Sequence, residues 1–171
     1  GGSASGVRPT VTLPQGQTTI TLVVNDGHVN SDPDTVRITV TNTPPVANAG
    51  PDQSVPRSTP NGASVTLHCC DSSDANHDTL TYTWTWSGGT ATGACPTVTL
   101  PQGQTTITLV ANDGELDSEP DTVLITVTNT APVANAGPDQ SVPRSTPTGA
   151  SVILDGSGSS DANHDTLTYT W

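Results

Sequence analysis

The sequence predicts an all-β protein built from tandem β-sandwich repeats with a period of 87 residues. A long internal repeat and a series of short alternating segments are the two observations that predict it. Residues 45–57 return unchanged as residues 132–144, and residues 13–23 return as residues 100–110. Self-similarity at a fixed offset of this length is typical of an array in which each repeat is one small domain.

Five segments of the complete repeat alternate Thr or Ser with apolar, β-branched or aromatic residues, which is the pattern of half-buried strands. Clusters of Pro, Gly, Asn and Asp separate them and indicate tight turns. No segment has a helical period, so we expect a sandwich or a barrel. The expected strands are residues 64–67, 79–86, 97–100, 105–110 and 122–127.

An aromatic stripe marks the inward face of the second of these strands, where Tyr82, Trp84 and Trp86 alternate with threonines. Such a stripe can bind sugar, but its position in the middle of a strand favours packing in the core. The chain has no Phe and no Met, so the rest of the core must come from Val, Ile and Leu.

The repeat also predicts the domain organisation. We expect a complete domain over residues 44–130, preceded by the C-terminal half of a domain over residues 1–43 and followed by an N-terminal half over residues 131–171. The links between these units are short and contain proline. Links of this kind act as stiff spacers, which favours end-to-end stacking as a rod.

The motifs of the repeat resemble the PKD (polycystic kidney disease) repeat along the whole chain. The resemblance is carried by Pro-Val-Ala-Asn-Ala-Gly-Pro-Asp-Gln-Ser-Val, by residues 152–161, by Thr-Leu-Thr-Tyr-Thr-Trp and by Val-Asn-Asp-Gly. It implies a seven-stranded immunoglobulin-like (Ig-like) sandwich of secreted and cell-surface proteins, used as a spacer or adhesion module. Two places depart from it. Residues 68–71 read His-Cys-Cys-Asp where the sister unit reads Asp-Gly-Ser-Gly, and the loop over residues 74–78 lacks the glycine of Asp-x-Asp-Gly-Asp.

The amino-acid composition limits the classes of molecule that the chain is expected to bind. The chain has 16 acidic residues against four Arg and no Lys, which gives a net charge of −12. Nucleic acid and anionic membrane surfaces need basic residues to neutralise phosphate, so both are poor partners for this chain, and we expect no binding of nucleic acid. No apolar run approaches the ~20 residues of a membrane span. Three cysteines in an acidic, Thr-rich β-protein indicate an oxidising, extracellular location. The absence of an initiator Met and a signal peptide indicates a piece of a longer precursor.

Oxygen-bearing residues gather in loops that share one pole of an Ig-like sandwich. Carboxylate and amide oxygens suit Ca²⁺, which takes six to eight hard ligands, and the resemblance adds that some PKD repeats bind calcium at this pole. Turn chemistry alone also accounts for Asp and Asn here. The expected calcium ligands are Asp74, Asn76, Asp78 and Asp113 with Asn48 near, and, at the joint with an adjoining chain, Asp161, Asn163, Asp165 and Asn135 with Asp26.

The cysteines occur only in the complete unit. If Leu67 pairs with Val98 across antiparallel strands, the same register sets Cys70 opposite Cys95, and we expect a disulfide between them. Cys69 then points inward as a small apolar residue. A soft-metal or redox site built from the three cysteines and the neighbouring histidine is the alternative, but no Cys-x-x-Cys spacing supports it.

No pattern in the chain predicts catalysis. The four histidines lie in or beside loops, and there is no Gly-x-Ser-x-Gly elbow. Arg57 and Arg144 lie in Pro- and Ser-rich loops, where we expect solvated or ion-paired surface residues. We therefore expect a non-enzymatic structural protein. An adhesion or spacer module that grips polysaccharide or another surface ligand is the alternative, and it would need an exposed aromatic patch.

The half-units predict self-assembly. Each half alone would expose half of a core and an open sheet edge, and joining the rear half of one copy to the front half of another completes a domain. Such a head-to-tail contact is heterologous and extends as an open filament; a longer tandem array within one chain is the other possibility. The expected interface is Val152, Leu154, Leu167, Tyr169 and Trp171 against Val11, Leu13, Ile20, Leu22, Val36, Ile38 and Val40.

Overall fold

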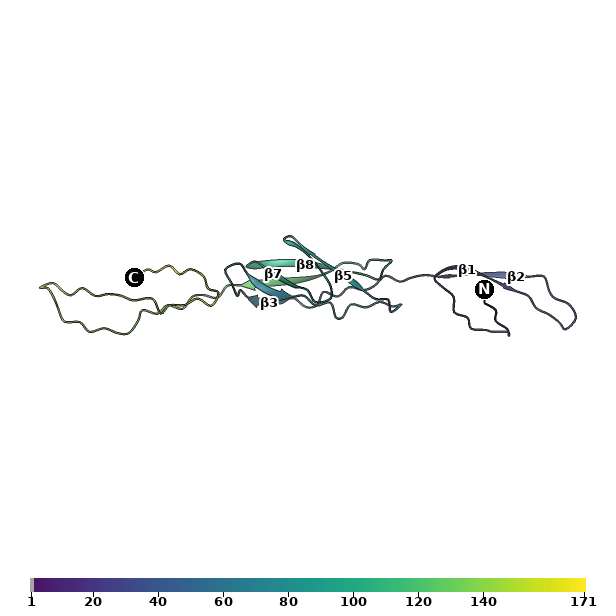
Figure 1. Ribbon diagram of the computed structural model, residues 1–171, viewed down its shortest axis with the longest axis horizontal. Helices are drawn as coiled ribbons and strands as arrows, with labels where there is room; N and C mark the ends of the chain where they lie inside the picture. The colour runs from purple at the N-terminus through teal and green to yellow at the C-terminus, as the bar shows by residue number, and fades with distance from the viewer. Residues whose placement is uncertain (1) are drawn as a thin grey trace. The chain divides into compact units, whose positions relative to one another are not determined.

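The computed structural model describes residues 2–171. The chain forms two compact units, Gly1–Pro44 and Pro45–Trp171. Figure 1 labels the principal strands of both units. Residues 2–171 contain no helix with the length and apolar character that crossing a bilayer requires.

The complete domain is an all-β sandwich, as the sequence predicts. Its larger sheet has five strands in the order β3-β9-β8-β5-β6, and its smaller sheet pairs β4 with β7. The seven strands are β3 (Gln53–Pro56), β4 (Ala63–Thr66), β5 (Thr81–Trp86), β6 (Gly89–Thr92), β7 (Thr97–Leu100), β8 (Gly103–Asn112) and β9 (Asp121–Thr128). This number of strands agrees with an Ig-like β-sandwich.

A single core holds the two sheets together, since buried residues of both belong to one cluster. Alternate residues of β8 and β9 enter it, because successive side chains of a strand point to opposite faces. Trp84 is fully buried, and its indole N–H donates to the carbonyl oxygen of Gly93 (3.0 Å). Tyr82 and Trp86 are half-buried and pack against the same cluster. The aromatic stripe is therefore core, as predicted.

Two details differ from the sequence prediction. The predicted strands do not include β3 or β6, because neither has two large apolar residues at alternate positions. The pairing of Leu67 with Val98 is wrong, since β4 and β7 pair with Val65 opposite Val98. The true register is shifted by two residues. Because the side-chain period of a strand is also two, each side chain keeps its predicted face.

The front unit contains one antiparallel hairpin. Its strands are β1 (Gly16–Leu22) and β2 (Asp34–Val40). Gly16 lies opposite Val40, and in the complete domain Gly103 of β8 lies opposite Val127 of β9. These pairs are 87 residues apart in sequence, so the hairpin of the front unit repeats the β8–β9 hairpin in the same register.

Residues 131–171 keep the turns of a domain but form no strand among themselves. The backbone N–H of Asn135 donates to Oγ of Ser159 (2.9 Å), as the N–H of Asn48 does to Oγ of Ser72 (2.9 Å) in the complete domain. Local hydrogen bonds thus form without the rest of the domain. Strand pairing does not, because β5 and β3 pair with the β8–β9 hairpin, and residues 131–171 contain no counterpart of that hairpin.

Candidate functional site

The two end segments display apolar residues of the kind that the complete domain buries. Their counterparts at an offset of 87 residues include Val65, Leu67, Trp84, Leu109 and Val123, which are all in the core. Every predicted interface residue is at least partly exposed in the isolated chain. Val11, Leu22, Val36, Ile38, Val152, Leu154, Tyr169 and Trp171 are exposed, and Leu13, Ile20, Val40 and Leu167 are half-buried.

A cavity of about 280 Å³ opens in the rear segment, and Val133, Tyr169 and Trp171 are among its lining residues. Gly156 also lines it, and a Cβ atom built there would lie 3.1 Å from Tyr169 and 3.3 Å from Trp171. In the complete domain the matching position holds Cys69, which is buried. The aromatic residues that fill a core in one repeat therefore border empty space in the other.

A charged joint connects the rear segment to the complete domain. The guanidinium of Arg57 pairs with the carboxylate of Asp165 and donates to Oδ1 of Asn129 (2.6 Å). Asn163, which is 1% exposed, donates through Nδ2 to the carbonyl oxygen of Arg57 and accepts the backbone N–H of Thr130 (2.8 Å). The Arg57 side chain is only 11% exposed, so Arg57 is an ion-paired residue of a joint and not a solvated one.

This joint includes Asn163 and Asp165, which the sequence predicts as calcium ligands. Arg57 and Asp165 lie 108 residues apart, so no local pattern links them. A signal exists in the repeat, however, because the same two residue types recur as Arg144 and Asp78. Each full repeat therefore carries both residue types, as the complete domain does with Arg57 and Asp78.

Three carboxylates meet where the loop before β5 approaches the turn between β8 and β9. Oxygens of Asp74, Asp78 and Asp113 lie within 4.8 Å of one another. Oδ1 of Asp74 accepts the backbone N–H groups of Asn76 (2.8 Å) and Asp78 (3.0 Å). Its Oδ2 is buried and has no hydrogen-bond partner within residues 2–171. A buried carboxylate oxygen without a partner is unfavourable, and a cation between the three carboxylates would satisfy it.

Two other predicted ligands of the complete domain have mainly turn roles. Oδ1 of Asn48 accepts the N–H of Gly50 (2.9 Å). Oδ1 of Asp113 accepts the N–H groups of Glu115 (2.8 Å) and Leu116 (2.7 Å). The structure therefore brings Asp113 into the acidic cluster while its Oδ1 also shapes a turn.

The predicted ligands of the end segments repeat these turns. Oδ1 of Asp161 accepts the N–H groups of Asn163 (2.8 Å) and Asp165 (3.0 Å), as Asp74 does in the complete domain. Oδ1 of Asn135 accepts the N–H of Gly137 (2.8 Å). In the front unit Asp26 accepts the backbone N–H groups of Val29 and His28. These hydrogen bonds lower the pKa of Asp26 below its ordinary value.

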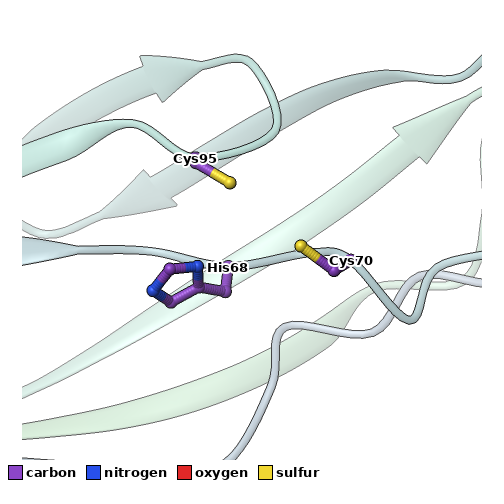
Figure 2. A group of neighbouring side chains, drawn as sticks. All are labelled: His68, Cys70 and Cys95. Carbon is purple, nitrogen blue, oxygen red and sulfur yellow. The ribbon is translucent and has the colours of Figure 1, made fainter.

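A second cluster consists of His68, Cys70 and Cys95, whose ligand atoms lie within 4.8 Å of one another (Figure 2). All three side chains are exposed. The cysteines of the described chain are thiols, so the predicted disulfide is not formed here. Desolvation and the neighbouring Cys70 thiol raise the pKa of Cys95. Cys69 is buried, as predicted, and burial raises its pKa.

Comparison with known proteins places the chain beside two mammalian sequences, and no family model matches it. The "Dyslexia-associated protein KIAA0319 homolog" of Mus musculus is 33% identical over 171 residues, which is 89% of this chain and 15% of that protein. The protein of the same name from Rattus norvegicus is 32% identical over 172 residues, with the same coverage. The chain thus spans about 15% of the length of these curated relatives.

Two solved structures align with the chain at a TM-score of 0.38. One is a nucleoside hydrolase-related hypothetical protein from Saccharophagus degradans, 24% identical, with 52% of this chain and 26% of that one covered. The other is Dpr2 Ig1-Ig2 in complex with DIP-Theta Ig1-Ig3, 14% identical, with 71% and 43% covered. At that TM-score neither alignment supports a functional assignment. The Ig-like sandwich rests on the strand order of the complete domain itself.

Proposed function

We propose that this chain is a non-enzymatic, extracellular structural module of the PKD type whose end segments are completed by neighbouring copies of itself, head to tail. The proposal rests on one observation: both end segments expose apolar residues whose counterparts form the core of the complete domain. Trp171 and Leu22 are exposed, and their counterparts Trp84 and Leu109 are fully buried. Because the counterparts of these two surfaces form one core in the same chain, we expect the surfaces to be complementary in shape and polarity.

The complete domain specifies the pairing expected at the junction. Trp84 of β5 lies opposite Leu109 of β8, and Val55 of β3 lies opposite Val127 of β9. Shifted by one repeat, Trp171 of one copy lies opposite Leu22 of the next. Likewise, Val142 of one copy lies opposite Val40 of the next. The junction buries a domain core cut in half, at about 25 cal/mol per Å² of apolar surface. Because the two faces differ, the contact is heterologous and extends as an open filament.

The charged joint supplies a second contact for the array. Arg57 forms an ion pair with Asp165 within one copy. In the composite domain the counterpart of Arg57 is Arg144, and the domain that follows it presents Asp78, the counterpart of Asp165. We therefore expect Arg144 of one copy to pair with Asp78 of the next. A carboxylate has two oxygens, so Asp78 can accept the guanidinium on one and keep the other toward Asp74.

Calcium is the cation proposed for the cluster of Asp74, Asp78 and Asp113. Support comes from the closeness of the three carboxylates and from the buried, unpartnered Oδ2 of Asp74. Hard oxygen ligands favour Ca²⁺ over thiophilic metals. Bound calcium would tie the loop before β5 to the β8–β9 turn and stiffen this pole of the domain. At the junction the expected set remains the one that includes Asp161 and Asp26 of an adjoining copy.

The Cys70–Cys95 disulfide is proposed for the chain under oxidising conditions. Its support is that the two sulfur atoms already lie within 4.8 Å of one another. Two thiols that lose two protons and two electrons to a small-molecule disulfide would close the bond and release two small thiols. The bond would cross-link the segment after β4 to the segment before β7.

The decisive experiment measures assembly of this chain. Sedimentation velocity over a range of concentrations, followed by electron microscopy, should detect a series of head-to-tail oligomers and filaments. Leu22→Asp should weaken association roughly 100-fold or more, because an unpaired charge in a core is unfavourable by about 3 kcal/mol. Thr19→Asp is the matched control. It lies in the same strand, and its counterpart Thr106 is exposed in the complete domain, so association should persist.

A concentration-independent monomer would overturn the filament. The adhesion alternative would then stand, and binding of polysaccharide or another surface ligand through Tyr169 and Trp171 would be the property to measure, because these are the large exposed aromatics of the chain. A Leu22→Asp chain that assembles like the wild type would show that association uses another surface.

A further inference from the structure

His68, Cys70 and Cys95 lie on two segments that hydrogen bonds hold together. After β4 the chain keeps its alternation, so Leu67 and Cys69 enter the core while His68 and Cys70 face outward. Two hydrogen bonds fasten this segment to the one before β7. The N–H of Leu67 donates to the carbonyl oxygen of Pro96 (3.0 Å), and the Cys69 thiol donates to the carbonyl oxygen of Ala94 (3.1 Å). Cys95 lies between these two acceptors in sequence.

The three side chains converge. Figure 2 shows the sulfur atoms of Cys70 and Cys95 pointing toward one another, with the imidazole of His68 beside them. Their ligand atoms lie within 4.8 Å of one another. Zinc bonds of about 2.3 Å to sulfur and about 2.0 Å to nitrogen separate tetrahedral ligand atoms by roughly 3.5–3.8 Å. Small side-chain rotations on exposed residues are enough to close the remaining difference.

The repeat distinguishes a metal site from a disulfide alone. One repeat away, His68 is matched by Asp155, Cys70 by Ser157 and Cys95 by Arg8. All three positions thus differ from their counterparts, and only the complete domain combines one imidazole with two thiols at these positions. A disulfide accounts for the two cysteines and gives the histidine no role. A metal site accounts for all three.

We propose that the reduced chain binds one Zn²⁺ ion through an imidazole nitrogen of His68 and the thiolates of Cys70 and Cys95, with water in the fourth position. Two thiolates and one imidazole match the softness of zinc, and three protein ligands leave one tetrahedral position open. Oxidation of the two thiols to a disulfide removes two of the three ligands. Metal and disulfide are therefore alternative states of the same cluster. This site does not depend on assembly.

The test uses the whole chain, reduced with a phosphine that does not bind metal and titrated anaerobically with Co²⁺ and then with Zn²⁺. We expect one Co²⁺ per chain, with the tetrahedral and thiolate-to-metal absorption bands of a two-thiolate site that Zn²⁺ displaces. Cys70→Ser and Cys95→Ser should abolish the thiolate band. His68→Ala should lower Zn²⁺ affinity by at least about tenfold, since even the loss of an outer-shell partner has an effect of this size.

Cys69→Ala is the matched control, because Cys69 is buried and lies outside the cluster. It should bind Zn²⁺ as the wild type does. The proposal fails if the reduced wild type binds Zn²⁺ no better than the Cys70→Ser chain. It also fails if His68→Ala leaves affinity unchanged, or if Cys69→Ala abolishes the thiolate band. The variants with changes at the exposed positions 68, 70 and 95 keep the core, and circular dichroism verifies that they are folded.

Discussion

The complete domain and the two end segments carry nearly the same sequence. Apolar residues that are buried in the complete domain are exposed in the end segments. Trp84 is 0% exposed and its counterpart Trp171 is 62% exposed. Leu109 is 0% exposed and its counterpart Leu22 is 60% exposed. The turns, in contrast, are alike in both. Residue type thus fixes local hydrogen bonding here, whereas burial depends on whether the other half of the sandwich is present.

This difference in burial indicates which part of the chain can be stable by itself. A sheet hides its apolar face only against a second layer, and the end segments each supply one part of such a pair. An apolar surface of this extent is typical of an interaction site. We therefore expect the complete domain to be stable alone and the end segments to gain stability when copies associate.

Exchanging the two tryptophans for alanine should give the largest contrast. Trp84→Ala removes a buried aromatic ring, and we expect the free energy of unfolding of the complete domain to fall by about 3–5 kcal/mol. Trp171→Ala should leave the unfolding of the dilute chain almost unchanged and weaken association of copies. Urea unfolding at low concentration measures the first effect and sedimentation the second. Equal destabilisation by both variants would contradict the comparison.

Oxidation tests a feature that only the complete domain has. The Cys70–Cys95 bond would close a loop of about 25 residues, which the chain-entropy model values at roughly 3 kcal/mol. Denaturant unfolding of the oxidised and reduced chain should differ by this amount, with mass spectrometry to confirm the bond. The Cys70→Ser chain serves as control and should unfold identically in both conditions. A bond that forms through Cys69 would refute the assignment.

Calcium binding compares the acidic loop of the complete domain with its copy one repeat away. At a hundredfold excess over its dissociation constant, Ca²⁺ should stabilise the complete domain by about 2.7 kcal/mol, detected as a rise in melting temperature that a chelator reverses. Asp74→Asn should remove the rise, because it removes a carboxylate from the cluster. Asp161→Asn, the same change one repeat away, should leave it in place. A melting temperature that calcium does not move would exclude the site.

A pH titration tests the turn of the front unit and should give the smallest effect. The hydrogen bonds from Val29 and His28 lower the pKa of Asp26. A lowered folded-state pKa means that the stabilisation is present above the unfolded value and is lost as the pH falls through the folded one. NMR should therefore find the pKa of Asp26 below 3.8, the ordinary value of an aspartate side chain. A midpoint above it would mean that these bonds do not form.

Much of the fold was predictable because it is local. Alternation located β4, β5, β7, β8 and β9, and the parity of Cys69 predicted its burial. Strands β3 and β6 were missed because neither has two large apolar residues at alternate positions, whereas β7, of the same length, has Val98 and Leu100. The sequence reached a disulfide hypothesis through a register that is wrong by two residues. It still brought Cys70 near Cys95, because a shift by a whole side-chain period preserves the face.

The sequence by itself determined the period of the repeat, the all-β class, the inward face of the aromatic strand and the turns, since each depends on neighbours along the chain. Only the tertiary structure decided the register of β4 against β7, the ion pair of Arg57 with Asp165 and the convergence of His68 with Cys95. These contacts join residues that are far apart in sequence. Such contacts form only after the sheets have packed, because packing brings distant segments close enough for their side chains to interact.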